Sequence, residues 1–569
     1  MAYFSYGRIL EQKVVHASNA KETPARRLYD GFDYVPTRRE VLFGHHFSSI
    51  AGVAPIVGPA LALCWGWLPG ILWVWFGNIF IGAVHDYLAL MASVRHDGKS
   101  IQFVTVEILG KRTGKAFYGI SFFFLVMIIA SLGTVLGSLF IRTPQIASTF
   151  LWTTIAALIL GVLIYRLKNV GFSTATIVGI ILLAASITLG ILFPIQASYT
   201  TWMVVFFFYI IIASALPVHT LLQPRDYLNS FLLYTGILIG LVGTLFAFRG
   251  FEIPVVTTFS PLLSAGKPTP LWPAMPLIIA CGALSGLHSL VGSGTSSKQL
   301  PKESDGLLIG YGGMLTEGFL STMVIAAIAG FGYTAIQKSG ADMGIDVMLN
   351  PTNWAALFTS TTESVELTGA NLFIESYTDM IAATWLGIIP AEAITVIAGM
   401  WVAAFGMTTL DTANRLGRYC ITEVFSSGKT GSRASAGFLT NRFFTSFIPA
   451  LLGIYLAWSG NLTVLWPTFG AANLLIASIA LMTGAWYIKH RLGSRYYLCA
   501  VIPAWLIWTT ATAALLWFMA VVIPALIAED PGTGWTVMII CLIMVITNVT
   551  CIIDCIAKGK KASSQASIE

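Results

Sequence analysis

The sequence predicts an all-α polytopic membrane protein with about 14 transmembrane helices. Its composition indicates this class, because 56% of the 569 residues are hydrophobic and only 10% are charged. The mean hydropathy is +0.78. A soluble chain of this length could not cover its surface with so few charges, whereas a chain embedded in a bilayer requires no more. The distribution of Lys and Arg along the chain supports the same class.

The apolar stretches are long enough to cross about 30 Å of hydrocarbon as helices of about 20 residues. We number them as spans in chain order. The expected spans are 42–67, 71–94, 116–140, 146–165, 173–193, 200–218, 230–248, 272–295, 306–335, 391–410, 443–458, 462–486, 498–526 and 534–556. We expect the following parts: a cytoplasmic segment over 1–41, a transport core over 42–410, a cytoplasmic loop over 411–442, C-terminal transmembrane helices over 443–556 and a basic cytoplasmic tail over 557–569.

Threading these spans through a membrane places nearly all Lys and Arg residues on one side. Of the 32, the exceptions are Arg142, Arg249, Lys267 and Lys338. Basic loops stay on the cytoplasmic side, so both termini are predicted to be cytoplasmic. The net charge of +6 is therefore interpreted as a topology signal, and we expect no nucleic-acid partner.

An acidic segment over 336–390 falls on the outer side of this topology. Its stretch 371–389 is rich in apolar residues and is expected to be helical. It could lie on the outer surface, form a lid over an entrance, or pack as a cap on the spans.

Two spans carry residues that interrupt helices. The first contains Gly52, Pro55, Gly58 and Pro59, and the sixth ends in SALPVHTLLQPRDY (214–227). Proline removes a backbone donor and clashes with the preceding turn. Irregular backbone at membrane depth is tolerated only where it is buried in protein or lines a cavity.

The positions of these interruptions predict an inverted repeat. One five-span half covers about 42–193 and the other about 200–410, and they enter the membrane from opposite sides. Broken helices at corresponding positions of two such halves are typical of alternating-access transporters. The alternative is that these are ordinary proline kinks.

We place the substrate between the two predicted breaks, because freed N–H groups attract carboxylates and freed carbonyls hold cations. The candidate substrate-binding residues are Gly52, Val53, Ala54, Pro55, Gly58, Ser214, Pro217, His219 and Gln223.

Polar residues within the spans are candidates for binding a coupling ion or proton. Glu317 lies about 16 Å into the ninth span, and a buried carboxyl group that stays protonated can carry a proton. A structural hydrogen bond is the alternative. Asp411 and Arg415 are four residues apart and can pair on one helix face, which we interpret as an inner gate or a structural latch.

The eighth span adds hydroxyl groups and a histidine in its inner half. Ser285, His288 and Ser289 could form an oxygen-rich site for a monovalent cation such as sodium. The alternative is that the hydroxyls join neighbouring helices by hydrogen bonds.

A second group of candidates lies near the inner ends of the first two spans. His45, His46, His85 and Asp86 could bind a transition metal such as Zn²⁺ or relay protons near neutral pH. Neither pair has the i, i+4 spacing of a helical metal motif, and helix capping or hydrogen bonding between helices is the alternative.

Seven stretches spread over nearly the whole chain resemble the carbon starvation protein A (CstA) family of peptide transporters. They are DGFDYVPTRREVLFGHHFSSIAGVAPIVGPALA (30–62), GAVHDYLALMASVRHDGKSI (82–101), LLQPRDYLNSFLL (221–233), GALSGLHSLVGSGTSSKQLPKESD (282–305), IGYGGMLTEG (309–318), TTLDTANRLGRY (408–419) and LWPTFGAANLL (465–475). Many members carry an apolar span ahead of the segment that FSYGRILEQKV (4–14) resembles, and this sequence starts at that segment.

The resemblance implies a multi-pass protein of the cytoplasmic (inner) membrane that imports short peptides, with pyruvate or another small carboxylate as the alternative cargo. It implies a LeuT-like five-plus-five repeat of the amino acid–polyamine–organocation superfamily, with additional helices. Secondary active transport driven by a proton or cation gradient would follow, and the family name links the activity to carbon starvation. We expect that the protein is not an enzyme and requires no cofactor. Its expected partners are the cargo and membrane lipids. A Walker A motif is absent, so ATP is not expected as the direct energy source. A channel or a membrane sensor is a further alternative.

Overall fold

The computed structural model describes residues 1–165, 171–217, 220–247, 249–264, 267–342, 369–425, 441–458, 462–493, 495–529 and 531–566. Within these residues the fold is almost entirely helical. The exception is a pair of antiparallel strands, β1 (Leu262–Ser264) and β2 (Lys267–Pro268). The prediction of an all-helical polytopic membrane protein is confirmed at this level.

Ten helices in the described part of the chain are long and apolar enough to cross a membrane, and all ten coincide with predicted spans. They cover Trp67–Val94, Lys111–Arg142, Pro144–Ile164, Ser173–Leu192, Leu222–Phe246, Glu303–Gln337, Ala391–Thr422, Thr468–His490, Arg495–Ala528 and Val537–Ala557. The helices within them are α4 (Trp67–Gly77), α5 (Ala83–Val94), α7 (Lys111–Arg142), α8 (Pro144–Tyr165), α9 (Phe172–Leu192), α11 (Leu222–Phe246), α15 (Gly313–Asp342), α18 (Ala391–Phe425), α20 (Leu462–His490), α21 (Leu498–Trp517), α22 (Ile523–Glu529) and α23 (Pro531–Ala566).

The other predicted spans take different forms. The sixth and eleventh are the shorter apolar helices α10 (Tyr199–Ala215) and α19 (Arg442–Ala457). The first is a bent pair, α2 (Arg39–Ala51) and α3 (Ala54–Ala62), and the eighth is divided into α12 (Leu271–Ile278), α13 (Ala280–Ala283) and α14 (Gly286–Gly294). Two short helices outside the spans are α1 (Pro24–Arg27) and α6 (Ile101–Leu109).

The predicted break in the first span is confirmed at Gly52. The two parts of the span meet at an angle of 43°, and Gly52 has φ +48° and ψ −154°, a conformation that other residues rarely adopt. The irregular segment consists of Gly52 and Val53, which is shorter than predicted. Pro55 lies in the first turn of α3, where a missing N–H costs nothing, and Pro59 lies inside that helix.

The predicted break in the sixth span is wrong. α10 ends at Ala215 and α11 begins at Leu222, and α11 is a separate span. Pro217 therefore lies in a connection between two helices, and Pro224 lies in the first turn of the second, where proline is compatible with helix geometry. His219 lies outside the described residues.

The second interrupted span is instead the eighth. Its helical course stops at Ile279 and again at Leu284 and Ser285, which have extended backbones. It packs against α3: a Cβ atom built on Gly58 would lie 2.5 Å from the carbonyl oxygen of Ile278. The two interrupted spans are therefore in backbone contact, and glycine is required at this crossing.

The connection between the first two spans is also fixed to the segment before α12. Gly66 has φ +101°, and its Cβ position would overlap the carbonyl oxygen of Val255. The backbone N–H groups of Trp67 and Leu68 donate to the carbonyls of Pro254 and Val255, and that of Thr257 donates to the carbonyl of Trp65.

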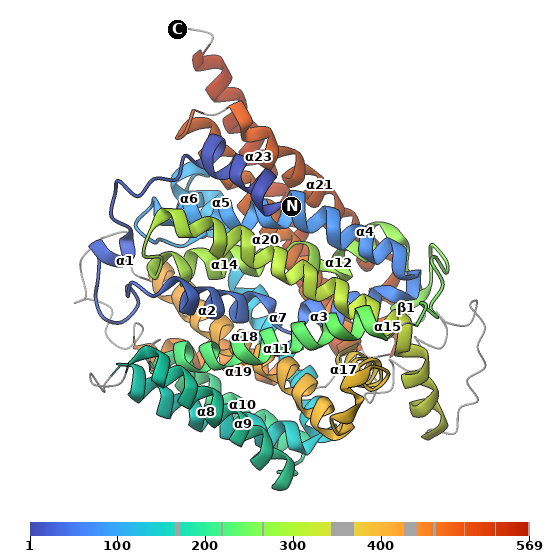
Figure 1. Cartoon of the computed structure of the whole chain (residues 1–569). Helices are drawn as coiled ribbons and strands as arrows, with labels where there is room; N and C mark the ends of the chain where they lie inside the picture. The colour runs from blue at the N-terminus through green and yellow to red at the C-terminus, as the bar shows by residue number, and fades with distance from the viewer. Residues whose placement is uncertain are drawn as a thin grey trace.

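Helix α17 (Gly369–Ala382) lies within the predicted acidic outer segment. It packs against α15, α18 and α3, and most of its residues are buried. It is thus a packed helix rather than one that lies on the surface. Figure 1 shows it at the opposite end of the molecule from α1.

The periphery of the bundle is apolar. α8 and α9 lie at one edge, and α21 and α23 lie at the opposite edge (Figure 1). Only 28% of the apolar window of α9 is buried, against 94% for the central helix α7. Exposed side chains such as Ile177, Ile181, Ile539 and Ile543 form the kind of surface that contacts lipid.

Candidate functional site

Four ionisable side chains form a continuous buried series between the spans. His85 Nδ1 lies 2.8 Å from Asp86 Oδ1, and His288 Nδ1 lies 2.7 Å from Asp86 Oδ2. His288 Nε2 lies 3.2 Å from Glu317 Oε2. All four side chains are fully buried. We call these residues the His–Asp–His–Glu chain.

Protonation in this chain is constrained by its geometry. An ionised Asp86 only accepts hydrogen bonds, so each histidine presents a proton at Nδ1. His288 Nε2 then faces Glu317, and neither His288 Nε2 nor the Glu317 oxygens have another hydrogen-bond partner among the described residues. A proton on Glu317 makes the contact a hydrogen bond between neutral groups, and a proton on His288 Nε2 makes it an ion pair. Either position makes the contact favourable.

Glycines bring the helices of this chain together. A Cβ atom on Gly310 would lie 2.9 Å from the Cα atom of Tyr87, next to Asp86. Gly313 lies against the ring of His46. His288 follows the extended residues between α13 and α14 and also interacts with the backbone of Ile50, two residues before the break in the first span. The chain therefore lies beside both interrupted spans.

A second buried group is centred on Arg225. We call it the Arg225 network, and it consists of Arg225, Asp226, Asp411, His45, Thr408 and Tyr209. Arg225 Nη1 lies 2.5 Å from Asp411 Oδ2, and its Nη2 lies 2.9 Å from Asp226 Oδ1. His45 Nδ1 lies 2.7 Å from the other oxygen of Asp226.

The Arg225 network joins four helices. Arg225 and Asp226 belong to α11, Asp411 and Thr408 to α18, His45 to α2, and Tyr209 to α10. Thr408 Oγ1 accepts from Arg225 Nη2 at 3.0 Å and donates to Asp226 Oδ1 at 2.9 Å. The network thus fixes α2, the N-terminal half of the first span, to α11 and α18, which are distant from it in sequence.

Sequence reasoning missed the role of Arg225, which was counted as a loop charge. The prediction that Asp411 pairs with Arg415 is wrong, because Asp411 pairs with Arg225. Arg415 Nη2 instead donates to the carbonyls of Ala213 and Leu216 at 3.1 and 2.6 Å. Those carbonyls end α10 and have no intrahelical partner. The helix-start signal of Pro224 could have placed Arg225 inside a helix.

The candidate substrate residues fall into two groups. Gly52, Val53, Ala54, Pro55 and Gly58 are buried at the break and in α3. Ser321 Oγ donates to the carbonyl of Pro55 at 2.9 Å, and Thr409 Oγ1 donates to that of Ser49 at 3.5 Å. This group adjoins both interrupted spans.

The second group contacts other elements. Ser214 Oγ accepts from Asn414 Nδ2 at 2.9 Å, and Pro217 lies in the connection after α10. Gln223 Nε2 donates to Gln299 Oε1 at 2.7 Å and to Thr37 Oγ1 at 3.2 Å. Ser214 therefore connects α10 to α18, and Gln223 connects α11 to the N-terminal segment and to the residues after α14.

The hydroxyl groups of the eighth span are satisfied by protein atoms. Ser285 Oγ donates to Asn473 Oδ1 at 3.1 Å, and Asn473 Oδ1 also accepts from the backbone N–H of Leu287 at 3.2 Å. Ser289 Oγ donates to the carbonyl of Gly286 at 2.7 Å. Asn473 of α20 thus compensates the interrupted backbone at membrane depth, as irregular segments there require.

The predicted metal ligands belong to three separate pairs. His45 contacts Asp226, His46 Nδ1 contacts Ser296 Oγ at 2.7 Å, and His85 contacts Asp86. Among the described residues, no group of three or more His, Cys, Asp and Glu side chains is arranged to hold a metal ion.

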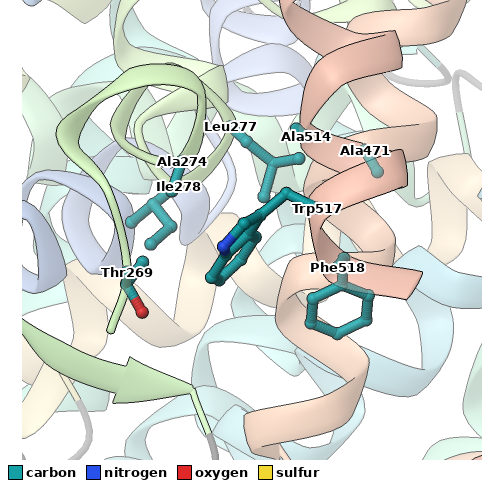
Figure 2. A pocket seen from close by; sticks show the side chains of 8 residues that line it. All are labelled: Thr269, Ala274, Leu277, Ile278, Ala471, Ala514, Trp517 and Phe518. Carbon is teal, nitrogen blue, oxygen red and sulfur yellow. The ribbon is translucent and has the colours of Figure 1, made fainter. Parts of the chain in front are cut away.

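An apolar pocket lies away from these charged groups. Its lining includes Leu277 and Ile278 of α12, Trp517 at the end of α21, and Phe518, which follows that helix (Figure 2). Its remaining lining residues are Thr269, Ala274, Ala471 and Ala514. The chemistry of this lining suits an apolar occupant and offers nothing to a charged one.

Together, the apolar helices, the two interrupted spans in contact and the buried ionisable chain beside them define a polytopic membrane protein with the features of a transporter. Residues 1–514 match the family described as "Carbon starvation protein CstA". The chain belongs to this family.

Named relatives agree with this class. The chain is 33% identical to the "Peptide transporter CstA" of Bacillus subtilis (strain 168) over 544 residues, which cover 91% of this chain and 88% of the relative. It is 30% identical to the protein of the same name from Escherichia coli (strain K12), over 90% of this chain and 78% of the relative. It is also 30% identical to the "Pyruvate/proton symporter BtsT" of Escherichia coli (strain K12), over 90% of this chain and 79% of the relative. These similarities support a membrane transporter.

Among solved structures, the chain is similar to a mutant of a manganese transporter from Eremococcus coleocola. The TM-score is 0.46 at 12% identity, over 93% of this chain and 99% of that one.

Proposed function

We propose that the protein is a secondary active transporter that imports short peptides across the cytoplasmic membrane, driven by the proton gradient, with both termini in the cytoplasm. The observation that carries this proposal is the buried contact between His288 Nε2 and Glu317 Oε2, 3.2 Å apart, beside two interrupted spans. Relatives named as peptide transporters support the cargo.

The His–Asp–His–Glu chain supplies the coupling step. When the proton leaves the His288–Glu317 pair, the ionised carboxylates of Glu317 and Asp86 remain close together with two neutral histidines. Two buried like charges are strongly unfavourable in a medium of low dielectric constant. The deprotonated protein must therefore rearrange, admit water, or take up a compensating group. This requirement links proton release to a change of conformation.

The two interrupted spans supply the moving parts. Gly52 in the first span and Leu284 with Ser285 in the eighth allow the half-helices on either side to change their relative angle. The Arg225 network holds the inner half of the first span against α11 and α18, so it must open before the cytoplasmic side can open.

A five-plus-five repeat is also part of this proposal. The second interruption lies in the eighth span, seven spans after the first. If the peripheral pair α8 and α9 stands outside the repeat, the eighth span becomes the sixth of the core and enters the membrane from the side opposite to the first. That is the arrangement expected of an inverted repeat.

Uptake of pyruvate or another small carboxylate is the second candidate function. It is favoured by the similarity to a relative named as a pyruvate/proton symporter. Peptides and pyruvate both carry a carboxylate, but only peptides carry an amine.

The test is uptake by the purified protein in proteoliposomes. A panel of di- and tripeptides is measured beside pyruvate, with proton and sodium gradients imposed separately. We expect accumulation of peptides only with an inward proton gradient. Accumulation of pyruvate alone would favour the second function, sodium-dependent uptake would contradict the proton mechanism, and the absence of any uptake would overturn the transporter proposal.

A further inference from the structure

We propose that the chain carries a carboxylate-binding site at the end of the bundle next to the N-terminal segment, formed by Arg415, Arg418 and Lys298, and that Asp33 of the same chain occupies it in this structure. The inference takes its ligand, a small carboxylate, from the proposed function. The site lies apart from the His–Asp–His–Glu chain.

Two cationic side chains lie over one aromatic ring, and a third cation lies near the carboxylate that this ring binds. The Arg418 Cζ atom lies 4.6 Å from the centre of the Tyr419 ring, and Lys298 Nζ lies 4.4 Å from it. Arg415 lies one helical turn before Arg418 on α18 and is fully buried, while Arg418 is 5% exposed. Stacking on aromatic rings holds such cations in place without neutralising them.

Asp33 is the carboxylate that these cations face. Its Oδ1 atom accepts a hydrogen bond from Tyr419 Oη at 2.7 Å and lies 3.9 Å from Arg415 Nη1. Burial acts to raise the pKa of Asp33, but Lys298, Arg418, the Tyr419 hydrogen bond and Arg415 outweigh burial and lower that pKa. A carboxylate is therefore stable here in its ionised form.

The N-terminal segment delivers Asp33 to this position. The backbone N–H groups of Val35 and Thr37 donate to the carbonyls of Lys298 and Gln299 at 3.2 and 3.0 Å. The guanidinium of Arg442 lies 3.6 Å from the ring centre of Phe32. Asp33 thus belongs to a non-helical segment that is held by these contacts. Its departure from the cations would not require a helix to unfold.

The two arginines have buried donor groups without a partner among the described residues. Arg415 Nε and Nη1 and Arg418 Nε and Nη2 are buried and have no hydrogen-bond partner within the described chain. Guanidinium groups bind carboxylates best through two parallel hydrogen bonds, and Asp33 provides none of these to Arg418. Within the described residues, Asp33 therefore supplies fewer acceptors than Arg415 and Arg418 together can use.

Space for a ligand adjoins the site. The lining of a small pocket next to it combines the polar side chains of Lys298, Tyr419 and Gln102 with the apolar side chains of Leu290 and Leu416. A carboxylate that enters this pocket meets Lys298 first and competes with Asp33 for the two arginines. In a transporter of carboxylate-bearing cargo, this arrangement receives the cargo at the cytoplasmic end and closes again when Asp33 returns.

The test measures binding of pyruvate to the full-length protein in detergent by calorimetry, without any gradient. The variants are Asp33→Asn, Asp33→Asn with Arg418→Gln, and Asp33→Asn with Arg418→Lys. The control is Glu375→Gln, which removes the carboxylate of the Arg142–Glu375 pair at the opposite end of the bundle.

We expect Asp33→Asn to strengthen pyruvate binding about tenfold, because a tethered competitor has been removed from a charge-assisted site. Adding Arg418→Gln should abolish that gain, adding Arg418→Lys should preserve part of it, and Glu375→Gln should leave affinity unchanged. The lysine variant keeps the test valid if the glutamine variant does not fold.

An unchanged affinity in Asp33→Asn would overturn the site, even if proteoliposomes still show uptake. Conversely, a gain in Asp33→Asn without any uptake would support the site while contradicting the proposed function. The same variant is also measured in nanodiscs of phosphatidylcholine and of phosphatidylglycerol, and with inorganic phosphate. If pyruvate binding is lost only in phosphatidylglycerol, the site binds a lipid phosphate and the cargo role is overturned. If binding is retained in both lipids, the cargo role is supported.

Discussion

Glu317 is the residue whose buried carboxyl group we propose carries the coupling proton. Replacement by Gln keeps the shape and the contact with His288 but removes the carboxyl group that would accept and release the proton. We expect Glu317→Gln to reduce gradient-driven accumulation to the level of liposomes without protein, while calorimetry still detects substrate binding. Unchanged accumulation would remove Glu317 from the coupling step.

Arg225 neutralises two buried aspartates, so its loss should be costly. Arg225→Met leaves Asp226 and Asp411 without their shared cation, and breaking a buried ion pair from one side typically destabilises by about 3–5 kcal/mol. Thermal unfolding in detergent measures this change. Arg249→Met, which breaks the half-exposed pair with Glu252, should cost at most about 1 kcal/mol.

A second substitution distinguishes charge from packing in the same network. Adding Asp411→Asn to Arg225→Met removes one of the unpaired carboxylates, so the double variant should be more stable than Arg225→Met alone. An equal or lower stability would show that the network acts through packing and not through charge.

Asp33 makes the attachment of the N-terminal segment dependent on pH. Its pKa is lowered in the folded protein because the nearby cations and Tyr419 outweigh the effect of burial. The attachment is therefore fully stabilised above the ordinary Asp value of about 3.9, and it is lost as the pH falls through the lowered pKa. The protection of the amides of residues 30–37 against hydrogen exchange, relative to their intrinsic rates, should decrease over that range. Asp33→Asn should already show the lower protection at neutral pH, with no further change in acid.

At the residue scale, the sequence singled out His85, Asp86, His288 and Glu317 as candidates but did not place them in one group, whereas the structure brings them into one buried chain. The i, i+4 rule assigned Asp411 to Arg415, since such pairs are favourable on isolated helices. The rule failed because a buried carboxylate selects the cation that tertiary packing brings to it, and a single sequence does not reveal that Arg225 is brought there.

Among the elements, the crossing of α3 and the eighth span depends on Gly58. A methyl group there would lie 2.5 Å from a backbone oxygen of Ile278, and backbone cannot move aside as a side chain can. We expect Gly58→Ala to destabilise the protein by about 1–3 kcal/mol and to impair uptake. Thermal unfolding and proteoliposome uptake measure the two effects.

The matched control is Gly119→Ala in α7, where a Cβ atom would meet nothing within 4 Å. That substitution should be neutral or stabilise by up to about 1 kcal/mol, because alanine favours helix. Equal effects of the two substitutions would contradict the importance of the crossing.

The break at Gly52 was predictable at the element scale, because two glycines and two prolines fall together in one apolar stretch. The break in the eighth span was not. Pro217 and Pro224 lie in a connection and a first turn, where proline is compatible with ordinary structure. The extended residues Leu284 and Ser285 have no proline beside them. Asn473 of a distant helix accepts hydrogen bonds from the Ser285 hydroxyl and the Leu287 N–H, and local sequence does not show this contact.

For the whole molecule, the positions of the spans were predictable because a bilayer sets their length and hydropathy. Charge placement further predicts that both termini lie on the cytoplasmic side. Single cysteines at position 2 and at Ser564 should therefore react with a membrane-impermeant reagent only after right-side-out vesicles are opened. A cysteine at Lys267 should react in intact vesicles, and the reverse pattern would invert the topology. The variants need a background in which native cysteines are replaced.

The backbone pairing between residues 65–68 and 254–257 has a mechanical consequence. These hydrogen bonds connect the turn after the first interrupted span to the segment that precedes the second interrupted span. If α3 moves away from the segment that precedes α12, these three backbone hydrogen bonds must break. Movement of the first interrupted span is therefore coupled to movement of the segment that precedes the second. A crosslink that immobilises one of them should restrict the other.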